Sequence, residues 1–216
     1  NVYDPGLLGD IGLPVGDGYI YKQDPFSSLD RQIALFGQAD VKITDRFKVT
    51  LGLRVSKADF VGQANYSGFV VGPPVSSSAS ITEHPVTPKI GFNYQFDADN
   101  LLYATVAKGY RIGGANPAIG QFCDFTPYGL TGVPPQYSSD SVWSYELGTK
   151  NTFDDRRLLL NASVYFIKWN NIQQNVALPC GFQFTDNLGA AQSRGFDLQT
   201  EYKLNDALTI GGTFGY

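Results

Sequence analysis

The chain has 216 residues, a formal net charge of -4, one histidine and two cysteines. The acidic balance argues against nucleic acid as the main partner. So few histidines and cysteines exclude a metal site built from several of them within this chain. Aromatic residues make up 14% of the chain, which argues against intrinsic disorder. No run approaches the eighteen apolar residues of a transmembrane helix, but a membrane barrel needs an apolar residue only at every second strand position.

Apolar and polar residues alternate through most of the chain, as they do in strands with two different faces. Between residues 47 and 55 the odd positions are apolar, and the even positions are polar or glycine. A helical arrangement would place charges on both faces of such segments. The alternation predicts an all-β chain with eight strands, near residues 31–43, 47–58, 86–96, 101–111, 142–151, 158–169, 194–204 and 207–216.

The connections between these strands are of two kinds. Tight turns rich in Asn and Asp are expected at residues 44–46, 97–100, 152–157 and 205–206. Long loops are expected at residues 59–85, 112–141 and 170–193, after a leading loop over residues 1–30. Pro88 falls inside a predicted strand, so we expect pairing there to begin only at Lys89. Short turns at one end and long loops at the other are typical of an outer-membrane barrel.

One face of each predicted strand is apolar, and the other is rich in Gly, Ser, Thr, Asn and Gln, as expected of a wet or plugged lumen. The expected lipid-facing residues include Val49, Leu51, Leu53, Phe92, Tyr94, Leu198 and Leu208. The charged residues expected to face inward are Lys42, Lys48, Arg54, Lys89, Arg111, Lys150, Lys203, Asp40, Glu146, Asp197 and Glu201. Aromatic residues expected in girdles at the membrane surfaces are Tyr94, Phe96, Tyr103, Trp143, Tyr145, Trp169 and Tyr202.

Lys108 has the lipid-facing parity, where a charge at mid-bilayer is costly. We expect its stem to snorkel towards the phosphates of the outer leaflet. A bulge that turns Lys108 inward is the alternative.

Three stretches carry a family resemblance. Residues 101–117 resemble the "Y-A-x-x-x-K-G-[FY]-R-x-G-G-x-N" strand of TonB-dependent outer-membrane receptors. Residues 143–151, followed by 158–169, are similar to the "Y-E-[LV]-G-x-K" hairpin of that family. Residues 187–197 resemble its "N-x-G-x-x-x-x-x-G-[FV]-[DE]" strand entry. The order and spacing of these motifs together are specific, and the resemblance covers residues 31–216.

The resemblance implies an antiparallel up-and-down transmembrane β-barrel of 22 strands in the bacterial outer membrane, of which this chain would hold about eight. Residues 1–30 would be an extracellular loop, and residues 31–216 a barrel segment whose long loops lie outside the cell. The plug domain and the TonB box of the family are not recognisable in this chain. Tyr216 would end an outward-running strand, whereas such barrels normally close with an inward-running one, so we expect a segment of a longer barrel.

The function implied by the resemblance is active uptake of a large scarce ligand, such as a siderophore, cobalamin, haem or an oligosaccharide. The implied partners are this ligand, the plug domain, the TonB complex, and the lipid and lipopolysaccharide of the outer membrane. No cofactor, metal site or catalytic group is expected, and the lone His84 leaves no pair of groups for acid–base catalysis, so an enzyme is disfavoured. A passive porin-like channel and a soluble β-rich binding module remain the alternatives.

The outer end of the strand near residues 101–111 holds the candidate ligand contacts. Arg111 could bind an anionic ligand near the mouth of the barrel. Tyr110 and Asn116, in the same stretch, are the other two candidates. The alternative for Arg111 is an ion pair with a carboxylate of a neighbouring strand or of the plug.

The two cysteines lie in two successive long loops, Cys123 in one and Cys180 in the next. The barrel topology places both loops on the same side of the membrane. A protein that reaches the outer membrane passes through an oxidising periplasm, where paired cysteines close. We therefore expect a disulfide between Cys123 and Cys180 rather than two free thiols.

Overall fold

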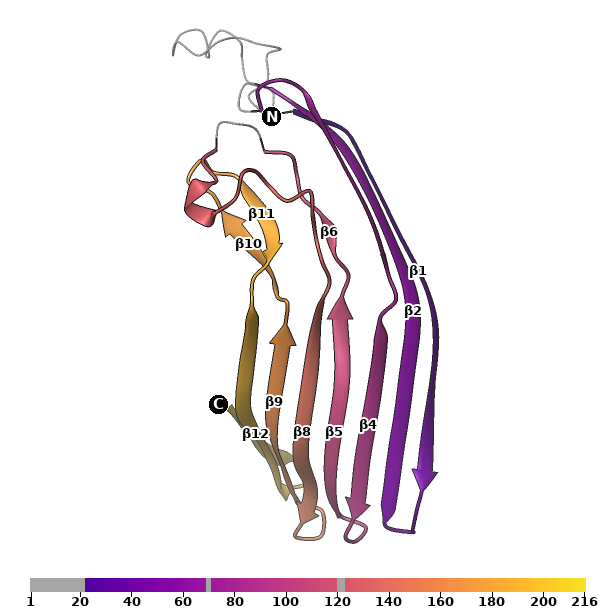
Figure 1. The fold of residues 1–216 in the computed structure, drawn as a ribbon. Helices are drawn as coiled ribbons and strands as arrows, with labels where there is room; N and C mark the ends of the chain where they lie inside the picture. The colour runs from indigo at the N-terminus through magenta and orange to yellow at the C-terminus, as the bar shows by residue number, and fades with distance from the viewer. Residues whose placement is uncertain (1–21, 69–70, 120–122) are drawn as a thin grey trace.

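The computed structural model describes residues 22–68, 71–119 and 123–216, and nearly all of their regular structure is β-strand. One antiparallel sheet contains nine strands in the order β1-β2-β4-β5-β8-β9-β12-β13, with β3 paired to β2 (Figure 1). Its strands are β1 (Lys22–Lys42), β2 (Phe47–Ser67), β3 (Val75–Glu83), β4 (Val86–Gln95), β5 (Asn100–Arg111), β8 (Asp140–Phe153), β9 (Leu158–Asn170), β12 (Ala190–Asn205) and β13 (Leu208–Gly215). Among the described residues, no helix has the length and apolar character needed to cross a membrane.

Tight turns join the strands at one end of the sheet, at the bottom of Figure 1, and the long connections gather at the other end. Short polar side chains close these turns by bonding to nearby backbone. The Thr44 hydroxyl accepts a hydrogen bond from the Phe47 backbone N–H at 3.0 Å. The Asp97 carboxylate accepts one from the Asp99 backbone N–H at 2.9 Å. We call the two ends of the sheet the turn end and the loop end.

The two faces of the sheet differ in polarity. Residues directly opposite each other in an antiparallel register point to the same face. The register aligns Thr50 with Gly91, Gly91 with Thr105, and Thr105 with Glu146, which together define a polar face. The eleven charged residues predicted to face inward all lie on this polar face. The seven residues predicted to face lipid all lie on the opposite, apolar face.

No protein layer covers the apolar face in the part of the chain that the structure describes. Leu35 is 76% exposed, Leu51 48% and Val164 53%. The clusters of buried hydrophobic residues lie at the loop end instead. A soluble sandwich would bury one face of each sheet in a common core. An apolar surface of this extent is unstable in water, so it requires an apolar medium.

Two segments predicted as loops are strands. β1 begins at Lys22, inside the leading loop predicted over residues 1–30. β2 continues to Ser67 and pairs with β3 throughout much of the loop predicted over residues 59–85. β3 contains a run of serines, so the apolar–polar alternation that marks a strand is absent there. We refer to residues 22–32, 58–67 and 75–83 as the β1–β3 extension.

Pro88 lies inside β4 and is paired with β2, so the prediction that pairing begins only at Lys89 was wrong on the β2 side and is confirmed on the β5 side. Ser56 donates its backbone N–H to the Pro85 carbonyl at 3.1 Å. Alternate residues of an antiparallel strand turn their backbone groups to opposite neighbours, so the nitrogen of Pro88 is directed towards β5. Pairing between β4 and β5 starts at Lys89. The missing N–H of Pro88 therefore removes no bond of the ladder.

The aromatic prediction was wrong for two residues. Trp143 and Tyr145 lie on the apolar face, with ring centroids 6.3 Å apart. Tyr103 and Trp169 lie on the polar face, where Tyr103 donates to Glu146 and Trp169 to Asp140. The Tyr103 hydroxyl and the Trp169 indole N–H thus donate hydrogen bonds on the polar face, and neither side chain belongs to a lipid-facing girdle.

The division of the sheet into two faces predicts opposite outcomes for lysine at two neighbouring positions. Leu51 lies on the apolar face, and Gln38 lies on the polar face of the adjoining strand. Leu51→Lys should reduce assembly in the outer membrane, because a lysine in the middle of the lipid-facing surface costs about 2–4 kcal/mol. Gln38→Lys should assemble normally. The fraction of heat-modifiable, folded protein in outer-membrane preparations measures both, and equal losses would contradict the assignment of faces.

Candidate functional site

Two long connections fold together at the loop end of the sheet. Their described residues, 112–119, 123–139 and 171–189, are called the loop module below. It contains β6 (Gly114–Ala115), the short 3-10 helix η1 (Thr126–Tyr128), β7 (Gln136–Tyr137), β10 (Gln173–Ala177) and β11 (Gln183–Asn187). β6 pairs with β7, and β10 pairs with β11. Figure 1 shows the module above β8 and β9, beside the β1–β3 extension.

Side-chain amides join the two halves of the module. Asn116, which is buried, donates to the carbonyls of Pro134 at 3.0 Å and Thr185 at 2.7 Å. Its own carbonyl accepts from the Thr185 backbone N–H at 2.8 Å. Gln173 donates from β10 to the carbonyls of Ile112 and Ser138, both at 2.9 Å. Asn116 thus bonds backbone groups of both connections, and Gln173 of the second connection bonds two carbonyls of the first, so the amides fix the two halves in one arrangement.

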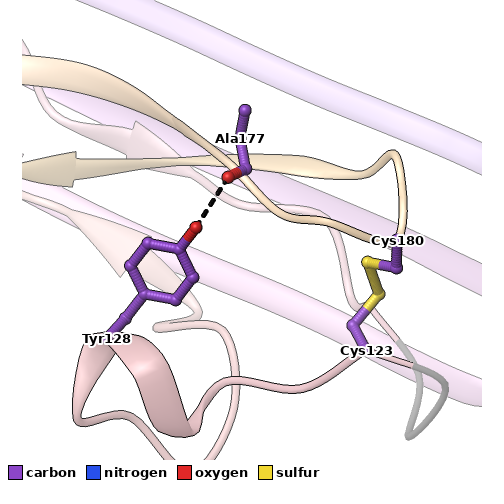
Figure 2. Close-up of a disulfide and its surroundings, with 4 residues drawn as sticks. All are labelled: Cys123, Tyr128, Ala177 and Cys180. Atoms are coloured by element: carbon purple, nitrogen blue, oxygen red, sulfur yellow. Dashed lines mark hydrogen bonds between the residues drawn. A yellow bond between two sulfur atoms is a disulfide. The ribbon is translucent and has the colours of Figure 1, made fainter.

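A small hydrophobic core and a disulfide complete the module. Cys123, Phe125, Leu178 and Phe184 form a buried cluster between the halves. Cys123 is bonded to Cys180, with Cα atoms 5.5 Å apart and a sequence separation of 57 (Figure 2). The predicted disulfide is confirmed in the structure. The bond crosses from one connection to the other, so it closes the module covalently.

The η1 turn lies next to the disulfide and is tied to the opposite hairpin. Tyr128 donates its hydroxyl to the Ala177 carbonyl at 2.9 Å (Figure 2). Ahead of the turn, the hydroxyl and the backbone N–H of Thr126 both donate to the Asp124 carboxylate. These hydrogen bonds hold the pKa of the Asp124 carboxyl below its usual range.

Arg111 joins the sheet to the loop module. Its guanidinium forms a bidentate ion pair with Asp140, the first residue of β8. The guanidinium carbon lies 4.9 Å from the centre of the Trp169 ring, and Trp169 donates to the same carboxylate at 2.9 Å. The Asp140 side chain is only 2% exposed, while that of Arg111 is 49% exposed. The backbone N–H of Gln173 also donates to Asp140, so one buried carboxylate organises β5, β8, β9 and β10.

The loop module packs against the polar face of the β1–β3 extension. Ala118 contacts a buried cluster that includes Ala64 and Tyr66 of β2. A side chain at Gly62 would meet the Ala115 methyl group at 3.3 Å, so glycine permits a close approach there. A pocket of about 350 Å³ remains between the two surfaces, lined by residues of β1, β2, β3 and the segment after β6.

A second pocket, of about 310 Å³, lies on the polar face of β1 and β2. It is lined by Asp30, Gln32, Arg54, Ala58, Tyr110 and Ile112. Arg54 donates to the side-chain amide oxygen of Gln32 at 3.3 Å, and the Gln32 amide nitrogen donates to the Tyr110 hydroxyl. No ion pair involves Arg54 within the described part of the chain. Its guanidinium, unlike that of Arg111, therefore has no carboxylate partner among the described residues.

The three predicted ligand contacts lie in different surroundings. Arg111 is paired with a carboxylate of the neighbouring strand, which is the alternative considered for it, and Asn116 has both ends of its amide occupied by backbone. Their contacts favour a positioning role, and ligand binding by these two residues stays a prediction. Tyr110 lines the second pocket. Sequence reasoning missed Asp140 and Gln173, because their roles depend on contacts between segments about thirty and sixty residues apart.

A family model described as "TonB dependent receptor-like, beta-barrel" matches residues 3–216 of the chain. The metal-pseudopaline receptor CntO of Pseudomonas aeruginosa is 26% identical over 213 residues, which is 96% of this chain and 27% of that receptor. The pesticin receptor of Yersinia enterocolitica is 23% identical over 171 residues, which is 79% of this chain and 23% of that receptor.

Solved structures give the same fold. The ferric yersiniabactin uptake receptor FyuA from Yersinia pestis superposes with a TM-score of 0.70 at 20% identity, over 88% of this chain and 27% of that one. The siderophore receptor PiuA from Acinetobacter baumannii has a TM-score of 0.65 at 19% identity, over 88% of this chain and 26% of that one.

The chain belongs to the TonB-dependent receptor family, in whose outer-membrane β-barrel it forms a segment of the wall. It spans about a quarter of the length of the relatives that it matches, 27% in the case of the metal-pseudopaline receptor. The apolar face of the sheet is accordingly the lipid-facing one. The family is one of transport receptors, and the soluble-module alternative is contradicted.

Loss of the disulfide should loosen the loop module and leave the sheet intact. For the loop that the Cys123–Cys180 bond closes, the chain-entropy model gives about 4 kcal/mol of stabilisation. The double variant Cys123→Ser/Cys180→Ser should therefore show faster amide hydrogen exchange in residues 123–139 and 171–189. Exchange in β4 and β5 serves as the internal control. Unchanged protection of the module would contradict a stabilising role for the bond.

Removal of the Asp140 carboxylate should weaken the attachment of the loop module to the strands and lower the stability of the protein. Asp140→Ala leaves the guanidinium of Arg111 and the indole N–H of Trp169 without their acceptor, at a cost of about 3 kcal/mol. Asp124→Ala, which removes an exposed carboxylate of the same module, should destabilise the protein much less, because water solvates that group in its place. Thermal unfolding of the detergent-solubilised full-length protein compares the two variants. Equal losses of thermal stability in the two variants would show that the Asp140 carboxylate does not hold the loop module on the strands.

Proposed function

We propose that this chain forms part of the wall and mouth of a receptor that actively takes up metal complexes of small organic chelators. Two of the relatives support this ligand class by their names, one as a receptor for metal-pseudopaline and the other as an uptake receptor for ferric yersiniabactin. The chain covers only part of those proteins, so the energy-coupling and plug functions would lie in other parts of the receptor.

The proposed topology places the loop end outside the cell and the tight turns in the periplasm. Barrels of the outer membrane have short periplasmic turns and longer extracellular loops, and the sheet has the same asymmetry. The loop module would then lie over the outer mouth of the barrel. Because it packs on the polar face of the β1–β3 extension, it covers the lumen side rather than the lipid side.

The pocket at Arg54 is the observation that carries the ligand proposal. It opens on the polar face, near the loop module, and contains a cation without a carboxylate partner among the described residues. Metal chelators of this kind present carboxylate or hydroxyl oxygens, which a guanidinium and a phenol can bind together. Arg54 and Tyr110 are therefore proposed as ligand contacts. Arg111 and Asn116 are proposed to affect ligand binding indirectly, because they hold the loop module in its position.

A passive channel is the competing function, and dependence on TonB separates the two. Cells that carry the full-length receptor should accumulate radiolabelled ferric yersiniabactin or metal-pseudopaline. Deletion of the tonB gene should abolish this accumulation if uptake is active. Accumulation that persists without TonB would favour a passive channel, and accumulation of neither probe would contradict the proposed ligand class.

Substitution of Arg54 tests the proposed pocket. Arg54→Ala should weaken binding of the accumulated probe to the purified full-length receptor about tenfold or more, the effect of losing one charge-assisted hydrogen bond. Lys48→Ala removes the same charge from the polar face of the same strand, near the turn end, and should leave affinity unchanged. Calorimetric titration measures both. Equal affinities of the Arg54 variant and the unmodified receptor would exclude this pocket.

A further inference from the structure

The ladder between β4 and β5 is interrupted near the loop end. Pairing of these two strands ends at Lys89 and Ala107. Beyond that pair, residues 86–88 of β4 pair with β2 and residues 108–111 of β5 pair with β8, but the described residues of β4 and β5 do not pair with each other. Where a ladder is interrupted, the backbone no longer closes a barrel wall, and side chains decide whether a solute can cross it.

A notch of about 340 Å³ lies at this interruption and reaches through the thickness of the wall. Lys108 and Ser141, on its lining, have the register of the apolar face. Glu83 and Asp140, also on its lining, have the register of the polar face. A groove in one surface of a sheet would be lined by side chains of one face only. The notch is therefore a passage between the two faces.

The notch is bounded at its loop-end side by a contact between β3 and the segment before β8. The Ser139 backbone N–H donates to one carboxylate oxygen of Glu83 at 3.2 Å. The other oxygen is buried and has no hydrogen-bond partner among the described residues. A buried carboxylate oxygen without a protein donor binds water, and the notch is far larger than the about 30 Å³ that one water molecule occupies. We call this bounded, hydrated passage the window.

Tyr110 fills the window. The ladder between β5 and β8 has no break, so Tyr110 starts from the same outward register as Lys108, and the bulge considered for Lys108 is excluded. The Tyr110 hydroxyl nevertheless accepts a hydrogen bond from Gln32 and lies 3.5 Å from the Ser56 hydroxyl, and both of these residues lie on the polar face. Tyr110 lines the notch as well as the Arg54 pocket. Its side chain therefore runs through the wall from one face to the other.

The window lies at the edge of the lipid-facing band. On the apolar face of β5, the residues from Leu102 to Val106 are uncharged, and the first charge is that of Lys108. Lys108 lines the outer side of the window. Since a charge inside the apolar band of a barrel is costly, its position marks the level at which the wall meets water.

We propose that Tyr110 gates a lateral window, through which water and small ions pass between the outer surface of the wall and the Arg54 pocket. The gate is held closed by the hydrogen bond from Gln32, and water can replace that bond at little net cost. Because the loop module packs on the polar face at the loop end, a solute that enters the pocket must displace water from a covered site. The window gives that water an outlet through the wall. This role is additional to the proposed uptake and does not depend on which metal complex is carried.

The test measures how fast a cysteine behind the gate reacts with a small cationic methanethiosulfonate, in the full-length receptor reconstituted into lipid. Ser56→Cys places a thiol beside the Tyr110 hydroxyl, whereas Cys123 and Cys180 are bonded to each other. Adding Tyr110→Ala should raise the rate constant about tenfold, the factor expected when a hydrogen bond no longer holds the gate closed. The receptor without Ser56→Cys gives the background. An unchanged rate constant would overturn the gate.

A bulky side chain in the notch separates passage through the window from entry at the mouth. In the Ser56→Cys/Tyr110→Ala background, Ser141→Trp should fill the outer side of the notch and restore the slow reaction. Leu147→Trp places the same ring on the same face of β8, six residues nearer the turn end, and should leave the reaction fast. Equal rate constants in these two variants would show that the reagent enters at the mouth, which would overturn the window.

A second blocking variant guards against a failure of Ser141→Trp to fold. Thr82→Trp approaches the notch from β3 and should slow the reaction in the same way. The heat-modifiable fraction identifies the variants that are folded, and only those are compared. A fast reaction in every folded blocking variant would contradict the proposal. Because no metal complex is present in the assay, its outcome is independent of the proposed transport function.

Discussion

The absence of any layer over the apolar face is the constraint on which the rest of the structure depends. In hydrocarbon every backbone N–H and C=O must find a partner within the protein, which a continuous antiparallel ladder provides. Side chains such as Leu51 and Val164 then need only a solvent that is itself apolar. The sheet therefore needs no hydrophobic core made of protein. Its polar side can carry glycine, serine and charged residues, because that side faces the lumen of the barrel.

Because the strands bury few hydrophobic side chains within the protein, the packing energy is concentrated at the loop end. The loop module has the only disulfide of the described chain and a buried hydrophobic cluster of its own. Asp140 connects that cluster to the strands, since its carboxylate accepts hydrogen bonds from β5, β9 and β10 at once. A buried carboxylate with several donors fixes one arrangement, because any other would leave a charge unpaired in a dry site. The loop end of the sheet is thereby given a defined shape.

The sequence was informative wherever one face of a strand meets lipid and uninformative wherever both faces are polar. The lipid-facing residues Leu53 and Phe92 were assigned from alternation alone, and the register agrees. The β1–β3 extension has no such contrast, so the sequence predicts loops over most of it. The disulfide could be predicted because the chain has only two cysteines, and the redox compartment and topology favour a bond between them. The partnership of Arg111 with Asp140 could only be offered as an alternative, since it depends on which of several carboxylates the register brings near.

The most direct test of this account is the periodicity of lipid contact along one strand. Spin labels placed one at a time at residues 160–166 of β9, in the full-length receptor reconstituted into lipid, would report accessibility to dissolved oxygen. The account predicts high oxygen accessibility at Leu160, Ala162, Val164 and Phe166, and low accessibility at Asn161, Ser163 and Tyr165. Uniform accessibility along the strand, or a period near that of a helix, would contradict it.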